Sequence, residues 1–284
     1  MKRLRWLLGA GSAMAVASAL MVAAGGAGAA STLPTINVAL NGTTVVVTGQ
    51  TVSGAVNVVT TVTGKPEPNG GTFLFRLNPG ESPSVFTQAA QAVGAHNGDL
   101  NYLEPYGSIV FDSFDAKGTS SAQTSLTPGN YLALDINTTG KGVPPHTFFT
   151  VTQSATPAAL PAPAATISTI EFGFTGPKTV HEGEVVRFQN DGFLVHMDVW
   201  EQVKTMAAAK EAVHLLLTTN GNGKKLNSLF INEGAFANPI STGGIVQETI
   251  TEKPGIYVQD CFMDTQDGRS HTQLGMERII KVVK

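Results

Sequence analysis

The segment GIVQETITEKPGIY, residues 244–257, decides the fold because its pattern occurs twice in the chain. The earlier copy is GTSSAQTSLTPGNY, residues 118–131, and both copies read Gly, nine residues, Pro-Gly, one residue, Tyr. A histidine follows each copy at a similar interval, His146 after the first and His271 after the second. A pattern repeated at the scale of a domain predicts two copies of one structural module.

Short runs of β-branched and aromatic residues fill the chain around these segments. Examples are TTVVVTG (43–49), GTFLFRL (71–77) and EVVRFQNDG (184–192), and residues that favour turns separate such runs. They are typical of the strands of a β-sandwich or barrel. One segment differs, because the Ala, Glu, Lys and Leu content of EQVKTMAAAKEAVHLLL (201–217) predicts a helix. We predict an all-β fold of two tandem domains, the second with a short helical insertion.

Two further segments divide the chain. Residues 1–30 have a basic head, an apolar run and small residues before Ser31, which is the layout of a bacterial secretory signal peptide. Residues 154–166 hold three prolines, six alanines and no charge, which is typical of a semi-extended linker. We predict domains at 31–153 and 167–284. Export to the periplasm or the cell surface is expected, with no membrane span left after cleavage.

The charge of the chain excludes one class of partner. The formal net charge is −3 at pH 7, and removal of Lys2, Arg3 and Arg5 with the signal segment would make it −6. No basic patch that could attract nucleic acid would remain in the exported chain. Nucleic acid is therefore not an expected partner.

Cys261 is the only cysteine in 284 residues. One cysteine cannot form an internal disulfide, so a thiol in an exported protein has three explanations: an inert buried side chain, an intermolecular disulfide or a metal thiolate. The neighbouring residues favour the third. Cys261 ends a predicted strand, His271 and Met276 follow in the next loop, and His196 opens another predicted strand. These four side chains are candidate metal ligands.

The softness of the four donors favours one metal. Two imidazoles, a thiolate and a weak thioether suit copper, with trigonal His2Cys ligation and a long axial methionine. Zinc would accept the imidazoles and the thiolate but gains little from thioether sulfur. We predict one copper ion at His196, Cys261, His271 and Met276. The alternative is that His196 is an ordinary semi-exposed residue and that no metal binds.

The motifs NDGFLVH (190–196) and PGIYVQDCFMDTQDGRSHTQLGM (254–276) resemble the cupredoxins, the plastocyanin and azurin group, and most of all their exported bacterial relatives with a long last loop. The resemblance covers about residues 167–284. It implies a Greek-key β-sandwich and a type 1 copper centre whose ligands fall on the four residues above. It also implies that Asn190 is a hydrogen-bond donor near the site.

Two departures from that family pattern matter. Nine residues separate Cys261 from His271, where plastocyanin-like proteins have only a couple, so the extra residues must loop out if both ligands are to reach one metal. In the first copy, Asp135 stands at the cysteine position and Val151 lies near the methionine position. We predict that the first domain is a degenerate copy without type 1 copper, in which His146 packs or hydrogen-bonds.

These features predict an exported protein that transfers single electrons between copper and a redox partner, with the first domain as a scaffold or partner surface. A second hypothesis is a copper carrier or buffer, whose partner would be a copper donor or acceptor. A third is a metal-free β-sandwich with a binding or structural role. An enzyme is not expected, because the six histidines include no His-x-His pair for further copper sites.

Overall fold

The computed structural model describes residues 32–63, 71–113, 118–135, 143–219 and 223–284. The predicted signal segment, residues 1–30, lies outside these ranges. Within them, no helix is long and apolar enough to cross a bilayer.

Strands dominate both halves of the chain. The elements of the first half are β1 (Thr35–Leu40), β2 (Val45–Gly49), β3 (Gly54–Val62), β4 (Thr72–Leu77), α1 (Val85–Ala95), η1 (Leu100–Leu103), β5 (Gly107–Asp112), β6 (Gly118–Leu126), β7 (Gly129–Asp135) and β8 (His146–Val151). Those of the second half are β9 (Ala165–Ile170), β10 (Gly173–Thr175), β11 (Thr179–His181), β12 (Val185–Asn190), β13 (His196–Val203), α2 (Met206–Thr219), α3 (Lys224–Asn227), β14 (Phe230–Ile240), β15 (Ile245–Thr249), β16 (Gly255–Asp260), η2 (His271–Leu274) and β17 (Glu277–Val283).

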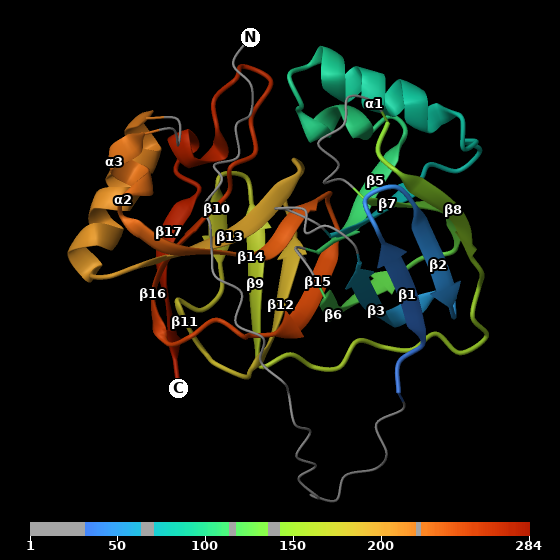
Figure 1. Cartoon of the computed structure of the whole chain (residues 1–284), viewed down its shortest axis with the longest axis horizontal. Coiled ribbons are helices and arrows are strands. Elements are labelled where there is room, and N and C mark those ends of the chain that lie inside the picture. The colour runs from blue at the N-terminus through green and yellow to red at the C-terminus, as the bar shows by residue number, and fades with distance from the viewer. Residues whose placement is uncertain (1–31, 64–70, 114–117, 136–142, 220–222) are drawn as a thin grey trace, which may run out of the picture.

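One eight-stranded sheet runs through both halves, which lie side by side in Figure 1. Its strand order is β10-β9-β12-β15-β6-β3-β1-β2, so each half supplies four neighbouring strands. The halves meet where Gln247 of β15 pairs with Gln123 of β6, and Gln247 Nε2 donates to Gln123 Oε1 at 2.8 Å. Because of this pairing, the two halves are joined by a contact between strands as well as by a linker.

A second sheet completes each half. The sheet β5-β4-β7-β8 belongs to the first half, and the sheet β11-β17-β16-β13-β14 belongs to the second. Alternate residues of strands such as β1 and β12 are buried, and their apolar side chains join one continuous core that extends through both halves. The prediction of an all-β fold with two tandem sandwich domains is confirmed.

The two Pro-Gly-x-Tyr segments have the same geometry. The hydroxyl of Tyr131 donates to Thr127 O at 2.7 Å, and the hydroxyl of Tyr257 donates to Lys253 O at 2.7 Å. Both tyrosines are buried, so each hydroxyl requires such a partner. The sequence repeat therefore forms the same hydrogen-bonded turn at the start of β7 and at the start of β16.

Helix α2 begins at Met206 and not at residue 201. Residues 201–203 instead extend β13, where they pair with both β14 and β16, and this pairing outweighs the helix propensity of Glu201. The helix packs on the second half's own sheet through small side chains and one leucine. The buried residues are Ala209, Ala212 and Leu216, which lie in a cluster with Val203, Leu226 and Val258. Leu217, next to the buried Leu216, is 41% exposed.

The helical segment α1–η1 of the first half was not predicted from the sequence. It covers one end of that half (Figure 1) and buries Val85, Phe86 and Ala89. Asn97 and Gly98, which follow α1, have φ angles of 59° and 92°. Asn-Gly after a short apolar run is a signal for a helix end, and it was available in the sequence.

The proline-rich segment before β9 contacts both halves. Ala158 O accepts a hydrogen bond from Ala55 N at 2.8 Å in the first half, and Ala164 N donates to Val185 O at 2.8 Å in the second. Pro161 O accepts from the side chain of Gln247 at 3.1 Å. These bonds hold the segment along the surface where the two halves meet.

Candidate metal centre

His196, Cys261 and His271 converge inside the second half. The ligand atoms of the three residues all lie within 4.8 Å of one another. His196 Nδ1 and His271 Nδ1 are 3.1 Å apart, and Cys261 Sγ lies 3.8 Å from the first and 3.4 Å from the second. All three side chains are fully buried. The structure therefore brings together three of the four predicted ligands through facing donor atoms.

His196 is placed by the turn between β12 and β13, which Asn190 holds in shape. Asn190 Oδ1 accepts from Gly192 N at 2.9 Å, and Asn190 Nδ2 donates to Leu194 O at 2.7 Å. The amide of Asn190 also bonds Ile240 O at 2.8 Å, so it ties the turn to β14. The resemblance suggested a donor near the site. The Asn190 amide does donate there, to Leu194 O and Ile240 O, and these bonds fix the backbone that carries His196.

Gly192 allows this turn to pass close to the histidine. A Cβ added at Gly192 would lie 2.9 Å from His196 Nε2 and 2.8 Å from Glu171 Oε1. Glu171 in turn accepts hydrogen bonds from the backbone N–H groups of Phe193 and Leu194. A side chain at position 192 would push on the imidazole or on the carboxylate that holds the turn.

Cys261 directly follows β16, and its sulfur is hydrogen-bonded. Met197 N donates to Cys261 Sγ at 3.4 Å, while Cys261 N donates to Met276 O at 3.3 Å. Burial raises the pKa of the Cys261 thiol to about 12, although hydrogen bonds from the backbone of Met197 and Met263 act in the opposite direction. Without a metal, the group is therefore a neutral thiol at physiological pH.

The long loop after Cys261 folds back on itself, which resolves the unusual spacing. His271 N donates to Met263 O at 2.7 Å. This bond brings His271 back beside Met263, two residues after Cys261, and residues 264–270 form a loop between them. This excursion is closed by an isolated bridge between Asp264 and Ser270, and Thr265 N donates to Arg269 O at 2.8 Å. The loop adds length without separating the thiol from the imidazole.

The last ligand candidate, Met276, lies directly after the short helix η2. Ser270 and Gln273 form a capping box at the start of η2, and Gly275 ends it with a φ angle of 97°. Met276 N then donates to His271 O at 3.0 Å, and the Met276 side chain is fully buried in the same core cluster as Cys261. The backbone thus ties Met276 to both neighbouring ligands.

Burial keeps both imidazoles neutral. It lowers the pKa of His196 to about 4. The pKa of His271 falls to about 3, mainly through burial and further through His196, whereas Asp99 and Glu171 oppose the decrease. A neutral imidazole offers a free lone pair, which is the form that binds a metal.

The donor set fits copper. Bonds of ~2.0 Å to nitrogen and ~2.3 Å to sulfur in a trigonal arrangement place the donors roughly 3.5 Å apart, close to the separations found here. Two imidazoles, one thiol and one thioether, all buried, are the ligand types of a type 1 copper site. His196, Cys261 and His271 bring their donor atoms together as such a site requires, and Met276 is buried in the same core cluster.

The strands that carry the ligands are braced by a buried carboxyl group. Asp198 Oδ1 accepts from Trp200 Nε1 and from Gln259 Nε2, both at 2.7 Å. Gln259 Oε1 accepts from Arg278 Nε at 2.5 Å. Burial raises the pKa of Asp198 to about 7, against the effect of these hydrogen bonds. The network joins β13, β16 and β17 immediately beside His196 and Cys261.

The other residues singled out in the sequence lie elsewhere. His146 is exposed and its Nδ1 is 2.8 Å from Pro144 O, and Asp135 accepts a hydrogen bond from Gly42 N at 3.2 Å. Among the residues with described positions, no second group of three His, Cys, Asp or Glu side chains brings its ligand atoms close enough together to hold a metal ion.

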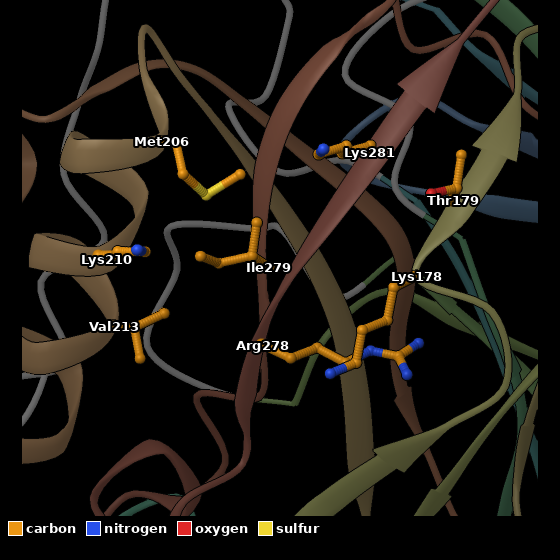
Figure 2. Close-up of a pocket in the computed structure, with 8 residues that line it drawn as sticks. All are labelled: Lys178, Thr179, Met206, Lys210, Val213, Arg278, Ile279 and Lys281. Atoms are coloured by element: carbon orange, nitrogen blue, oxygen red, sulfur yellow. The ribbon is translucent and has the colours of Figure 1, made fainter.

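A separate hollow of about 510 Å³ lies between α2 and β17, next to the edge strand β11 (Figure 2). Its rim carries Lys178, Lys210, Lys281 and Arg278, together with apolar side chains of α2 and β17. We expected no basic patch from the sequence, and this cluster corrects that expectation, because the fold brings together cations from three separate parts of the chain. The hollow does not contain any of the four metal ligands.

Comparisons with known proteins returned solved structures only. No family model matches the chain. No curated protein matches it either. Similar solved structures include an auracyanin from Roseiflexus castenholzii (18% identity, TM-score 0.26), which covers 42% of this chain and 95% of its own. A purple cupredoxin from Nitrosopumilus maritimus (14%, TM-score 0.24) covers 42% and 99%, and a copper-containing nitrite reductase from Thermus scotoductus (12%, TM-score 0.25) covers 88% and 67%. The donor atoms of this chain define the candidate site independently of these similarities.

We expect the substitution Gly192→Ala to weaken copper binding, because the added methyl group would press on His196 Nε2 and Glu171 Oε1. The loss should be roughly 10-fold or more in affinity, the range for changes next to metal ligands. Competition with a chelator measures it. Gly173→Ala is the matched control, because its Cβ would meet Ile170 at an ordinary 3.6 Å. Equal affinities for both variants would contradict this role of Gly192.

Copper(II) binding at neutral pH should release about one proton. The thiol, with its pKa near 12, must lose its proton to bind a metal, whereas both imidazoles, with pKa values near 4 and 3, are already neutral. The apparent affinity should therefore rise about tenfold for each pH unit, from pH 7 upward. Calorimetry in buffers of different ionisation enthalpy counts the protons. A release near zero would argue against Cys261 as a ligand.

Proposed function

We propose that this protein is an exported one-electron carrier that uses a type 1 copper centre in its second half. The observation that supports it is the set of two imidazoles and one thiol, with donor atoms 3.1 to 3.8 Å apart and fully buried on a braced sandwich. Copper bound there would supply reversible one-electron redox chemistry. Export is inferred from the layout of residues 1–30.

The protein's own residues suit electron transfer because they resist rearrangement. His196 is held by the Asn190 turn, Cys261 by backbone bonds on both sides, and His271 by η2. Close-packed sandwiches deform little, so the donor positions would stay nearly the same in both redox states. The N–H of Met197 stabilises negative charge on the sulfur.

An electron carrier is favoured over an enzyme or a copper carrier by the burial of the site. His196, Cys261, His271 and Met276 are each 0% exposed, so a substrate has no approach to the donor atoms. A protein that hands over metal ions likewise needs ligands that an acceptor can reach. An electron can tunnel between the metal and a partner through the side chains that cover the site, whereas a substrate or a metal ion cannot pass through them.

We further propose that the redox partner is acidic at its contact surface and docks at the hollow of Figure 2. Lys178, Lys210 and Lys281 are exposed there, and none has a carboxylate within ion-pair distance in the described part of the chain. A chain of hydrogen bonds leads inward from Arg278 to Gln259 and on to Asp198, two residues after His196. Docking there would place the partner at the outer end of this chain.

The centre itself is tested by loading the protein with Cu(II) beside the variant Cys261→Ser. We expect an intense thiolate-to-copper absorption band and a narrow copper hyperfine splitting in the electron paramagnetic resonance spectrum, both absent from the variant. The reason is that only a copper–thiolate bond produces them. A colourless protein that binds Cu(I) would support copper carriage instead. A protein that binds neither ion would leave a metal-free binding module.

The docking surface is tested by the rate at which ferricyanide, a small anionic oxidant, oxidises the reduced protein. Replacing Lys178, Lys210 and Lys281 by glutamine should slow this reaction roughly tenfold at low salt, because the cations raise the local concentration of anions. A control with glutamine at Lys224, Lys253 and Lys284 removes the same charge away from the hollow. The difference should vanish at high salt. Equal rates for the two variants would place the electron's exit elsewhere.

A further inference from the structure

The first half of the chain reaches the turn that carries His196. Val195 N donates to Asn101 Oδ1 at 2.8 Å, a bond between residues 94 positions apart in sequence. Asn101 lies in η1, and Asp99 is the N-cap residue of that short helix. This bond brings the start of η1 to the metal centre, so side chains of η1 are available to it.

Asp99 has one carboxylate oxygen more than its role in η1 requires. Asp99 Oδ1 accepts from Asn101 N at 2.9 Å and from Asn101 Nδ2 at 2.8 Å, which completes the cap. Asp99 Oδ2 is buried without a hydrogen-bond partner, and the residue is only 5% exposed. A buried carboxylate oxygen without a donor costs free energy, and a cap alone could be made by a neutral side chain.

His271 presents the matching donor. Its Nδ1 atom faces His196 and Cys261, so Nε2, on the far side of the ring, points away from the three donors. His271 Nε2 is also buried without a partner. Asp99 is one of two carboxylates whose charge acts on His271, and it acts on Asp264 in the same loop as well. A buried acceptor and a buried donor, each unsatisfied, therefore lie in the same region.

We propose that Asp99 is the carboxylate partner of His271 Nε2–H, so that the first half supplies a positioning residue to the copper centre. The two atoms do not form a direct hydrogen bond in the structure, so the proposed link runs through a bridging water. Ligating histidines usually donate their second N–H to a carboxylate, carbonyl or water, which fixes the tautomer and the ring orientation. The proposal rests on the copper site proposed above.

The negative charge of Asp99 has a predictable effect on redox equilibrium. A carboxylate near the ligands favours the state of higher positive charge, and therefore the oxidised one. It also makes the His271 imidazole a stronger donor. The first half is then part of the metal centre although it has none of the four ligands.

The test compares Asp99→Asn and Asp99→Ser with the wild-type protein. Both substitutions keep a side-chain oxygen that can cap η1 but remove the carboxylate. We expect the midpoint potential to rise and the affinity for Cu(II) to fall roughly 10-fold or more in both variants. Glu104→Gln is the charge control, because it removes an exposed carboxylate from the same segment, and it should change neither quantity.

A second readout does not need copper. Nitrogen NMR of the metal-free protein should show His271 as the Nε2–H tautomer in the wild type, and a shift toward the Nδ1–H tautomer in both Asp99 variants. An unchanged tautomer together with an unchanged potential would overturn the proposal while leaving a copper centre intact. If the wild-type protein showed no copper–thiolate band, the proposed function would fail, and the tautomer would still report whether Asp99 acts on His271.

Discussion

The antiparallel pairing of β13 with β16 is the constraint on which the metal centre depends. Val199 lies opposite Asp260 in this pair, so the register places the start of β13 beside the end of β16. His196 opens the first strand and Cys261 follows the second. A slip of one residue would turn one of the two ligands to the opposite face of the sheet. The Asp198, Gln259 and Trp200 network spans the same two strands and holds that register.

The centre is also built from groups that are neutral before a metal arrives. Two uncharged imidazoles, one thiol and one thioether can be buried at a far lower cost than charged ligands. The fold can therefore assemble around the empty ligand set, and the N–H of Met197 already points at the sulfur. Metal binding then adds charge to a set of ligands whose positions the fold has already fixed. This differs from small metal-dependent domains, in which the ion itself drives folding.

The parts that could be predicted from the sequence depend on residues close together along the chain. The Pro-Gly-x-Tyr repeat, the alternation within strands and the donors of residues 261–276 are local patterns. They indicated the fold class and two of the three residues whose donor atoms meet in the structure, Cys261 and His271. The third, His196, was a candidate only because a histidine opens another predicted strand 65 residues earlier. The contact of Asn101 with Val195 could not be predicted, because nothing in either sequence neighbourhood refers to the other. The start of α2 was misplaced for a similar reason, since strand pairing decides the conformation of residues 201–203.

The burial of the thiol has a consequence for its chemical stability. Oxidation of cysteine proceeds through the thiolate, and a group whose pKa is raised to about 12 by burial is almost entirely protonated at neutral pH. With no second cysteine in the chain and no exposure of its sulfur, Cys261 is protected from both peroxide and disulfide exchange. The same enclosure that shapes the ligand set thus preserves the thiol against oxidation until a metal ion takes the place of its proton.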